Sequence, residues 1–193
     1  LIDELEHGLE PHRIIRLLGS LGAKETPPPL QVFVTTHSPV ALQELVGSQL
    51  FVVRPDSNSH SVLAIGTEDD IQGTIRRHAD AFLAPSVIIC EGASEVGLIR
   101  GLDQYRIANG DDAIAAQGTA LVDGQGNANQ LIMRASVFRA LGYRVAIVRD
   151  DDKKPDASLE ANFIARGGKV LTWRAGRALE DELFLSLSTS AVE

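Results

Sequence analysis

The sequence has little cysteine, few aromatic residues and no long apolar run. Cys90 is the only cysteine, which excludes an intrachain disulfide framework and a thiolate metal site. It ends an apolar stretch, so we expect it to be a small packing residue. Aromatic side chains make up 5% of the chain, which argues against a surface that stacks on single-stranded nucleic acid. No apolar run approaches the length of a membrane-spanning helix, and we expect a cytoplasmic protein with no membrane partner.

Basic residues are also in short supply. The chain has 18 Lys and Arg against 26 Asp and Glu, a net charge of −8, which is unlike a simple basic nucleic-acid binder. The basic residues are unevenly distributed along the chain, because more than half of the Lys and Arg residues lie between Arg134 and Arg177. That part of the chain could therefore still present a positive face to an acidic partner.

The apolar pattern changes near Leu83–Pro85, where we place a boundary between domains 1–84 and 85–193. Upstream, the pattern predicts helices over 10–21, 40–46 and 71–82, a strand over 31–35, and two strands around a turn at 56–59. Downstream, predicted strands at 87–90, 120–122, 145–148 and 170–173 alternate with helices at 95–109, 127–141, 157–166 and 178–187. This alternation predicts an α/β fold, a parallel sheet with helices on both faces.

Carboxylates follow three of the four downstream strands. Glu91 follows the first strand with Glu95 one helical turn later, Asp123 follows the second, and Asp150, Asp151 and Asp152 follow the third. The carboxyl ends of parallel strands share one edge of a sheet, where ligands bind. Side chains alternate along a strand, so Asp150 and Asp152 are expected to point together and Asp151 away.

Any one of these acids alone is most often a helix cap or a solvated turn residue. Their recurrence at three strand ends favours a site, because clustered carboxylates repel one another unless cations are present. Carboxylate oxygens suit Mg²⁺ or Mn²⁺. Two such ions would support cleavage of a phosphodiester. Asp150 and Asp152, which are expected to point together, are the metal ligands that this pattern predicts.

Five stretches of the chain together carry a family resemblance. VIICEGASE, VDGQGN and VAIVRDDD resemble a Toprim domain, the metal-dependent catalytic module of topoisomerases, primases and certain nucleases. Its glutamate and its later D-x-D match Glu91 and Asp150 with Asp152. LIDELEHGLEPHR resembles the Walker B and D-loop of an ABC-type ATPase, and VFVTTHSP resembles its histidine switch. From Leu1 to about Leu187, the combination resembles the OLD (overcoming lysogenisation defect) family of ATP-dependent endonucleases.

The resemblance implies roles for individual residues. In the ATP site, Asp3 would be the acid on the magnesium side, Glu4 the base for ATP hydrolysis, and His37 the switch residue near the γ-phosphate. Glu91, Glu95, Asp150 and Asp152 would be catalytic. The metal ligands would be Glu91, Asp150 and Asp152, with Glu95 and Asp123 supporting or binding a second metal, and Glu91 would also act as general acid or base. Glu180 and Glu182 could add a ligand. The possible phosphate contacts are Lys153, Lys154, Lys169, Arg174 and Arg177.

The sequence departs from this family in lacking both the G-x-x-x-x-G-K-[ST] motif and the ABC signature. We therefore expect the C-terminal part of a longer protein, or a split or decayed gene. ATP would bind only with the missing N-terminal ATPase half. The expected partners are DNA, a second copy in a homodimer, and either that half or a partner protein.

Other functions remain open at this point. A topoisomerase is disfavoured because Tyr105 and Tyr143 are expected to be packing residues, and the ATPase-like segment argues against a primase. A non-catalytic dimerisation or interaction module with a relic metal site is the alternative.

Overall fold

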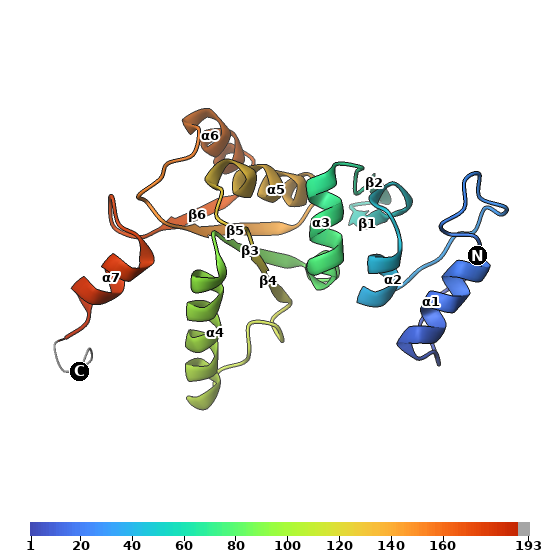
Figure 1. Ribbon diagram of the computed structural model, residues 1–193, viewed down its shortest axis with the longest axis horizontal. Helices are drawn as coiled ribbons and strands as arrows, with labels where there is room; N and C mark the ends of the chain where they lie inside the picture. Colours follow the sequence, from blue (N-terminus) through green and yellow to red (C-terminus); the bar gives the residue numbers. More distant parts are fainter. Residues whose placement is uncertain (189–193) are drawn as a thin grey trace. The chain divides into compact units, whose positions relative to one another are not determined.

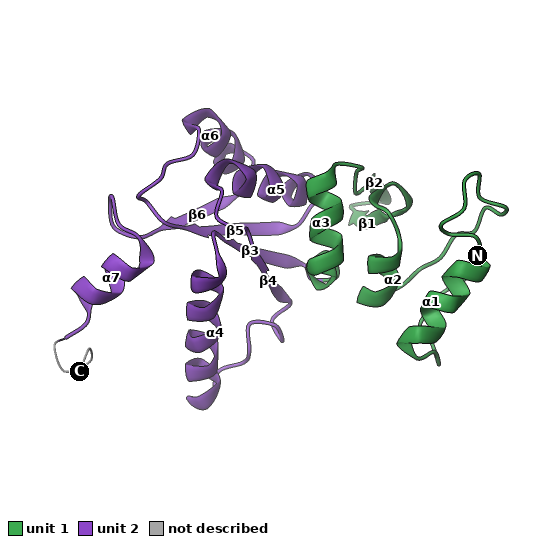
Figure 2. Cartoon of the chain, in the orientation of Figure 1, with its two compact units in different colours: residues 1–83 green, residues 84–193 purple. Residues whose placement is uncertain are grey.

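The computed structural model describes residues 1–188 (Figure 1). The chain divides into two units, Leu1–Leu83 and Ala84–Glu193 (Figure 2). None of the helices within residues 1–188 has the length and apolar character needed to cross a membrane.

A four-stranded parallel sheet forms the centre of the second unit. Its strand order is β4-β3-β5-β6, and its strands are β3 (Ser86–Cys90), β4 (Thr119–Asp123), β5 (Arg144–Arg149) and β6 (Lys169–Thr172). Each lies within two residues of its predicted position. Helices flank the sheet, so the predicted α/β class with a parallel sheet is confirmed.

The helices of the second unit are α4 (Ala93–Ala108), α5 (Ala128–Ala140), α6 (Ala157–Ala165) and α7 (Leu179–Ser186). α5 packs on β3 and β5 and also contacts α6, whereas α4 packs on β3 and β4 from the opposite face (Figure 1). Phe138 of α5 is buried and meets the Tyr143 ring edge-on, with a centroid distance of 5.3 Å. Tyr143 is a packing residue as expected. That expectation is wrong for Tyr105, which is 70% exposed on α4.

The first unit contains helices α1 (Pro11–Ser20), α2 (Pro39–Glu44) and α3 (Asp69–Arg77), the short 3-10 helices η1 (Gly47–Gln49) and η2 (Ala79–Phe82), and an antiparallel hairpin of β1 (Phe51–Asp56) and β2 (Ser59–Ala64). The helix predicted over 71–82 is divided between α3 and η2, because His78 leaves the helical conformation.

The strand predicted over 31–35 is reduced to one parallel bridge between Ile2 and Val34. The prediction of a full strand is wrong because this segment pairs only with residues 2–5 in the part of the chain that the structure describes. Leu5, Ile14, Leu18 and Ala41 form a small buried cluster beside it.

Candidate functional site

The strand order places Glu91 and Asp150 at a topological switch point. β3 lies between β4 and β5, so the chain leaves β3 toward one side of the sheet and later returns to the other. Ligands of open parallel sheets bind in the crevice at such a point, at the carboxyl ends of the strands. Glu91 follows β3, Asp150 follows β5, and the backbone N–H of Asp150 donates to Glu91 Oε2 at 3.0 Å. Acids from two strands therefore meet at this edge.

Glu95 joins them from the first turn of α4. Its Oε2 accepts a hydrogen bond from the backbone N–H of Gly92 at 2.8 Å, an arrangement that caps the helix and places negative charge at its positive end. The residue is only 4% exposed. A buried glutamate so close to other carboxylates is costly unless something compensates its charge.

The carboxylates at this edge influence one another. Burial is the largest cause that raises the pKa of Glu91, Glu95 and Asp150. Repulsion adds to it, from Asp150, Glu95 and Asp152 on Glu91, and from Glu180 on both Glu95 and Asp150. Backbone hydrogen bonds act in the opposite direction for all three. We call Glu91, Glu95, Asp150 and Asp152 the acidic edge.

The segment before α7 supports Asp150. The backbone N–H of Leu179 donates to Asp150 Oδ1 at 3.0 Å. The indole N–H of Trp173 is buried and lies near enough to Asp150 to favour its charged form, although the two do not form a hydrogen bond of ordinary geometry. The sequence indicates only a core or rim position for Trp173, since a contact with a residue 23 positions earlier leaves no local pattern.

Asp151 points away from the acidic edge. Its Oδ2 accepts from the backbone N–H of Gly176 at 2.9 Å, and its carboxylate also lies 3.6 Å from Arg149 and 3.7 Å from Lys154. The hydrogen bond from Gly176, followed by these two cations, holds the pKa of Asp151 below its ordinary value. Asp151 therefore fastens the loop after β5 instead of presenting charge to a ligand.

Arg149 is a second residue whose role the sequence did not reveal. It ends β5, is buried, and pairs with Glu160 at 3.0 Å as well as with Asp151. A basic residue directly before three aspartates was a signal for such a role. Its charge offsets part of the local excess of carboxylates.

Asp123 ends β4 in register with Cys90, at the same edge of the sheet as Glu91. Its Oδ1 accepts from the backbone N–H of Gln125 at 2.9 Å, which closes its own turn. Burial, followed by the charges of Glu95 and Asp123, raises the pKa of the Cys90 thiol to about 12. Cys90 is buried, as expected of a packing residue. The loop that follows Asp123 still supports Glu91, because Gly126 N–H donates to the Glu91 carbonyl at 2.6 Å.

The candidate phosphate contacts are divided between the two edges of the sheet. Lys169 begins β6 and pairs in register with Ala146, which precedes Asp150 by four residues or about 13 Å of strand. It is therefore remote from the acidic edge. Lys153 and Lys154 lie in the loop after β5 and are exposed. Arg177 is also next to this loop, where its carbonyl accepts from the N–H of Asp151.

Glu182 is engaged elsewhere. It lies 2.6 Å from Arg174 and 3.3 Å from Arg177. A hydrogen bond from Arg174 is the largest cause that lowers the pKa of Glu182, to about 2. Of the two late glutamates, only Glu180 acts on the acidic edge.

The donor chemistry of the acidic edge fits a hard divalent cation. Glu91, Glu95 and Asp150 each accept a backbone N–H on one carboxylate oxygen, which orients the side chain and leaves the second oxygen for a ligand such as Mg²⁺ or Mn²⁺. Within residues 1–188, however, no three acidic, histidine or cysteine side chains are grouped closely enough to hold an ion as they stand. Binding would require these side chains to turn toward a common point.

In the first unit, Asp3 and Glu4 lie beside the segment that leads to His37. The Thr35 hydroxyl donates to Asp3 Oδ1 and accepts from the backbone N–H of Glu4 at 2.9 Å. Glu6, which the sequence alone did not single out, accepts from the backbone N–H of His37 at 2.7 Å. The structure thus brings the three expected ATP-site residues to one region.

Glu6 also accepts from the Thr36 hydroxyl at 2.5 Å. Although burial acts to raise it, these hydrogen bonds hold the pKa of Glu6 below its ordinary value. The charged side chain of Glu6 therefore joins the segment after Glu4 to residues 36–37 through hydrogen bonds.

Residues 1–43 match the family model described as "AAA domain, putative AbiEii toxin, Type IV TA system". Comparisons with curated proteins and with solved structures found no match. The matched segment contains Asp3, Glu4 and His37 but covers less than half of the chain. The N-terminal part of the chain is therefore similar to AAA-type ATPase domains.

Proposed function

We propose that the second unit is a divalent-metal-dependent DNA endonuclease of the Toprim type. The first unit would be the C-terminal part of the ABC-type ATPase of the same OLD-like enzyme. The observation that carries the proposal is the direct contact between Glu91 and Asp150, 59 residues apart, at the switch point of the sheet. The similarity of residues 1–43 to an AAA domain supports the second statement.

In this proposal the acidic edge would hold the metal. The metal would activate water and stabilise the leaving oxygen of the phosphodiester. The backbone N–H groups of Asp150, Gly92 and Leu179 hold one carboxylate oxygen of Glu91, Glu95 and Asp150, respectively. Glu91, whose pKa burial raises above its ordinary value, would accept or return a proton during hydrolysis.

Binding of DNA would fall to the cations beside the acidic edge. Lys153 and Lys154 are exposed in the loop after β5, and Arg177 adjoins that loop. Phosphate contacts of this kind lose affinity at high salt, because the release of counterions from DNA becomes less favourable. Cleavage should therefore weaken as the salt concentration rises.

The first test is cleavage of supercoiled plasmid by the purified chain with Mg²⁺ or Mn²⁺. Glu91→Gln and Asp152→Asn remove charge from the acidic edge with little change of shape. Asp112→Asn is the matched control, because Asp112 is exposed in the connection between α4 and β4. We expect nicking or linearisation that needs metal, disappears in both site variants and persists in the control.

A second candidate function is a non-catalytic interaction module. It is favoured by exposed apolar residues of the first unit, since Phe33, Phe51, Val53 and Val62 are each more than half exposed. Val53 and Val62 pair across the hairpin and share one face with Phe51. Surfaces of this kind commonly bind another protein.

Calorimetric titration with Mg²⁺ and Mn²⁺ separates the two candidates. A folded chain that neither cleaves plasmid nor binds metal would exclude the nuclease and leave the interaction module. A chain that binds metal at the acidic edge but does not cleave would indicate that the ATPase half is needed for activity.

A further inference from the structure

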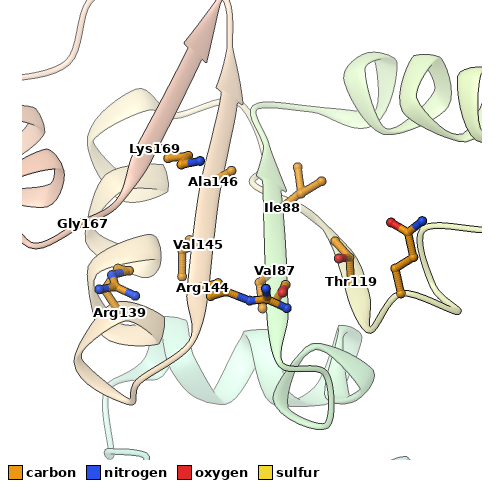
Figure 3. Close-up of a pocket in the computed structure, with 11 residues that line it drawn as sticks. Val87, Ile88, Thr119, Arg139, Arg144, Val145, Ala146, Gly167 and Lys169 are labelled. Carbon is orange, nitrogen blue, oxygen red and sulfur yellow. The ribbon is translucent and has the colours of Figure 1, made fainter.

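A second candidate binding site lies at the opposite edge of the same sheet. A groove of about 510 Å³ crosses the beginnings of the four strands (Figure 3). This volume lies within the range of small-molecule sites in proteins. Its lining includes the first residue of every strand, namely Ser86, Thr119, Arg144 and Lys169. The groove belongs entirely to the second unit.

Strand register gathers the polar side chains of this groove into one row. Ser86 pairs with Thr119 on one side and with Arg144 on the other. Paired residues of neighbouring parallel strands place their side chains on the same face, about 4.8 Å apart. The row therefore offers two hydroxyl groups and a guanidinium within about 10 Å. Lys169 pairs with Ala146, one step further along the same face, and adds an ammonium beside the row.

The groove is positively charged in a chain that is acidic overall. None of its 11 lining residues is acidic, although the chain has a net charge of −8. Within residues 1–188, Arg144 and Lys169 form no ion pair, in contrast to Lys154 and Arg174 at the other edge. Two exposed cations without a carboxylate partner attract an anion from solution.

Arg139 contributes a third, fixed positive charge to the wall. Its Nε and Nη2 donate to the carbonyl of Arg166 at 3.1 and 2.7 Å, and its Nη1 donates to the carbonyl of Tyr143 at 2.5 Å. These carbonyls hold the guanidinium in place without neutralising it. The guanidinium of Arg139 is therefore preorganised, whereas the side chains of Arg144 and Lys169 are exposed to solvent.

The floor of the groove is apolar. Ile88 and Ala146 pair in register on the same face as the polar row, both line the groove, and both are half-buried. A simple inorganic anion would leave this floor uncovered. A ligand that carries both phosphate and a flat, less polar part would contact the cations and the floor together. A nucleic-acid strand would need a longer basic stripe than the groove supplies.

We propose that this groove binds a phosphate-bearing small molecule of the nucleotide class. The phosphate groups lie on Arg144 and Lys169, which form charge-assisted hydrogen bonds with phosphate oxygens. The hydroxyl groups of Ser86 and Thr119 add neutral hydrogen bonds, and the less polar part of the ligand covers Ile88 and Ala146. This site needs no metal and is separate from the acidic edge.

The test is titration of the purified chain with ADP in the presence of EDTA. Binding is measured by calorimetry and by the chemical shifts of the backbone amides in NMR spectra. EDTA removes divalent metal, so phosphate cannot bind through an ion at the acidic edge. We expect saturable binding of ADP that is tighter than that of pyrophosphate or adenosine alone. The shifts should concentrate at residues 86–88, 119, 144–146 and 169.

Charge-removing variants test the assigned contacts. Arg144→Gln and Lys169→Gln should each weaken ADP binding about tenfold, the usual effect of losing one hydrogen bond to a charged group. Arg100→Gln on α4 and Arg16→Gln on α1 remove the same charge from exposed positions outside the groove. These two controls should bind ADP as the wild type does.

Several outcomes would overturn the proposal. They are the absence of saturable ADP binding up to about 10 mM, equal affinities for the site variants and the controls, or shifts centred on the acidic edge. A duplex oligonucleotide that binds these residues more tightly than ADP would also replace the small-molecule ligand with nucleic acid. Because ADP binding is measured without metal and plasmid cleavage requires it, either proposal can fail without the other.

Discussion

Replacement of Gly124 by alanine should destabilise the second unit and displace Glu91. Gly124 begins the loop after β4, and its N–H donates to the Cys90 carbonyl at 2.7 Å. An added Cβ would lie 2.5 Å from that carbonyl oxygen and 2.4 Å from Leu131 Cδ1. The oxygen belongs to β3 and cannot retreat without moving the strand, so the loop has to move. The hydrogen bond from Gly126 to the Glu91 carbonyl would be lost with it.

The magnitude follows from these contacts. Overpacking of a closed site costs about 1–3 kcal/mol, and loss of a backbone hydrogen bond adds about 1 kcal/mol. We therefore expect Gly124→Ala to lower the free energy of unfolding of the second unit by about 2–4 kcal/mol. Plasmid cleavage should fall as well, because the loop no longer fixes the backbone at Glu91.

Urea denaturation followed by tryptophan fluorescence measures this effect. Trp173 is the only tryptophan and lies in the second unit, so its signal reports on that unit. Gly97→Ala is the matched control, since Gly97 is within α4 and an added Cβ there would meet nothing within 4 Å. The free energy of unfolding of the Gly97→Ala control should be about 0.5–1 kcal/mol higher than that of the wild type. A Gly124→Ala protein within about 0.5 kcal/mol of the wild type would refute the reasoning.

Three further perturbations have defined outcomes. Raised pKa values at the acidic edge mean that the folded unit binds protons more tightly than the unfolded chain, so its stability should rise as pH falls from 7 toward about 4.5. Below that range the pairs of Glu182, with its pKa of about 2, begin to be lost. Urea titrations at several pH values check this prediction. A free energy of unfolding that decreases as the pH is lowered from 7 toward about 4.5 would contradict it. Glu91→Gln keeps an acceptor for the Asp150 N–H but removes one of the repelling charges. Thermal denaturation in EDTA should therefore show a melting temperature a few degrees higher, which corresponds to a gain of about 1 kcal/mol in the free energy of unfolding. Mg²⁺ should no longer stabilise this variant. A lower melting temperature would indicate a structural role instead. Glu6→Ala should accelerate hydrogen exchange at the His37 amide about tenfold or more, a loss of about 1–3 kcal/mol, while Glu6→Gln should stay close to the wild type. If the His37 amide exchanges at the same rate in Glu6→Ala as in the wild type, Glu6 does not hold the segment before His37.

The apolar pattern was sufficient to predict the strands and helices of the second unit. β3 was expected at 87–90 and is Ser86–Cys90, and α5 was expected at 127–141 and is Ala128–Ala140. Such elements depend on local periodicity, which a single sequence displays. The strand expected at 31–35 failed for the opposite reason, because a strand exists only where a neighbour pairs with it.

Placement of the site residues was predictable in part. The strand ends identified the edge at which Glu91 and Asp150 meet. The turn that Asp123 closes through its Oδ1 was not predictable in this way, because it depends on the backbone conformation of the loop after β4. Lys169 was expected to contact phosphate beside the acids, but it lies at the opposite edge of the sheet. It is the first residue of β6, whereas the acids follow the ends of the strands.

By itself, the sequence determined which segments form strands and helices, that the carboxylates follow the strands, and that residues 1–43 are ATPase-like. These properties depend on neighbours along the chain. Only the tertiary structure decided that β3 lies between β4 and β5, which brings the acids of two strands together and assembles the basic groove at the other edge. Both sites depend on contacts between residues far apart in the sequence, because hydrogen bonding and electrostatic repulsion act over a few ångströms of space and not along the chain.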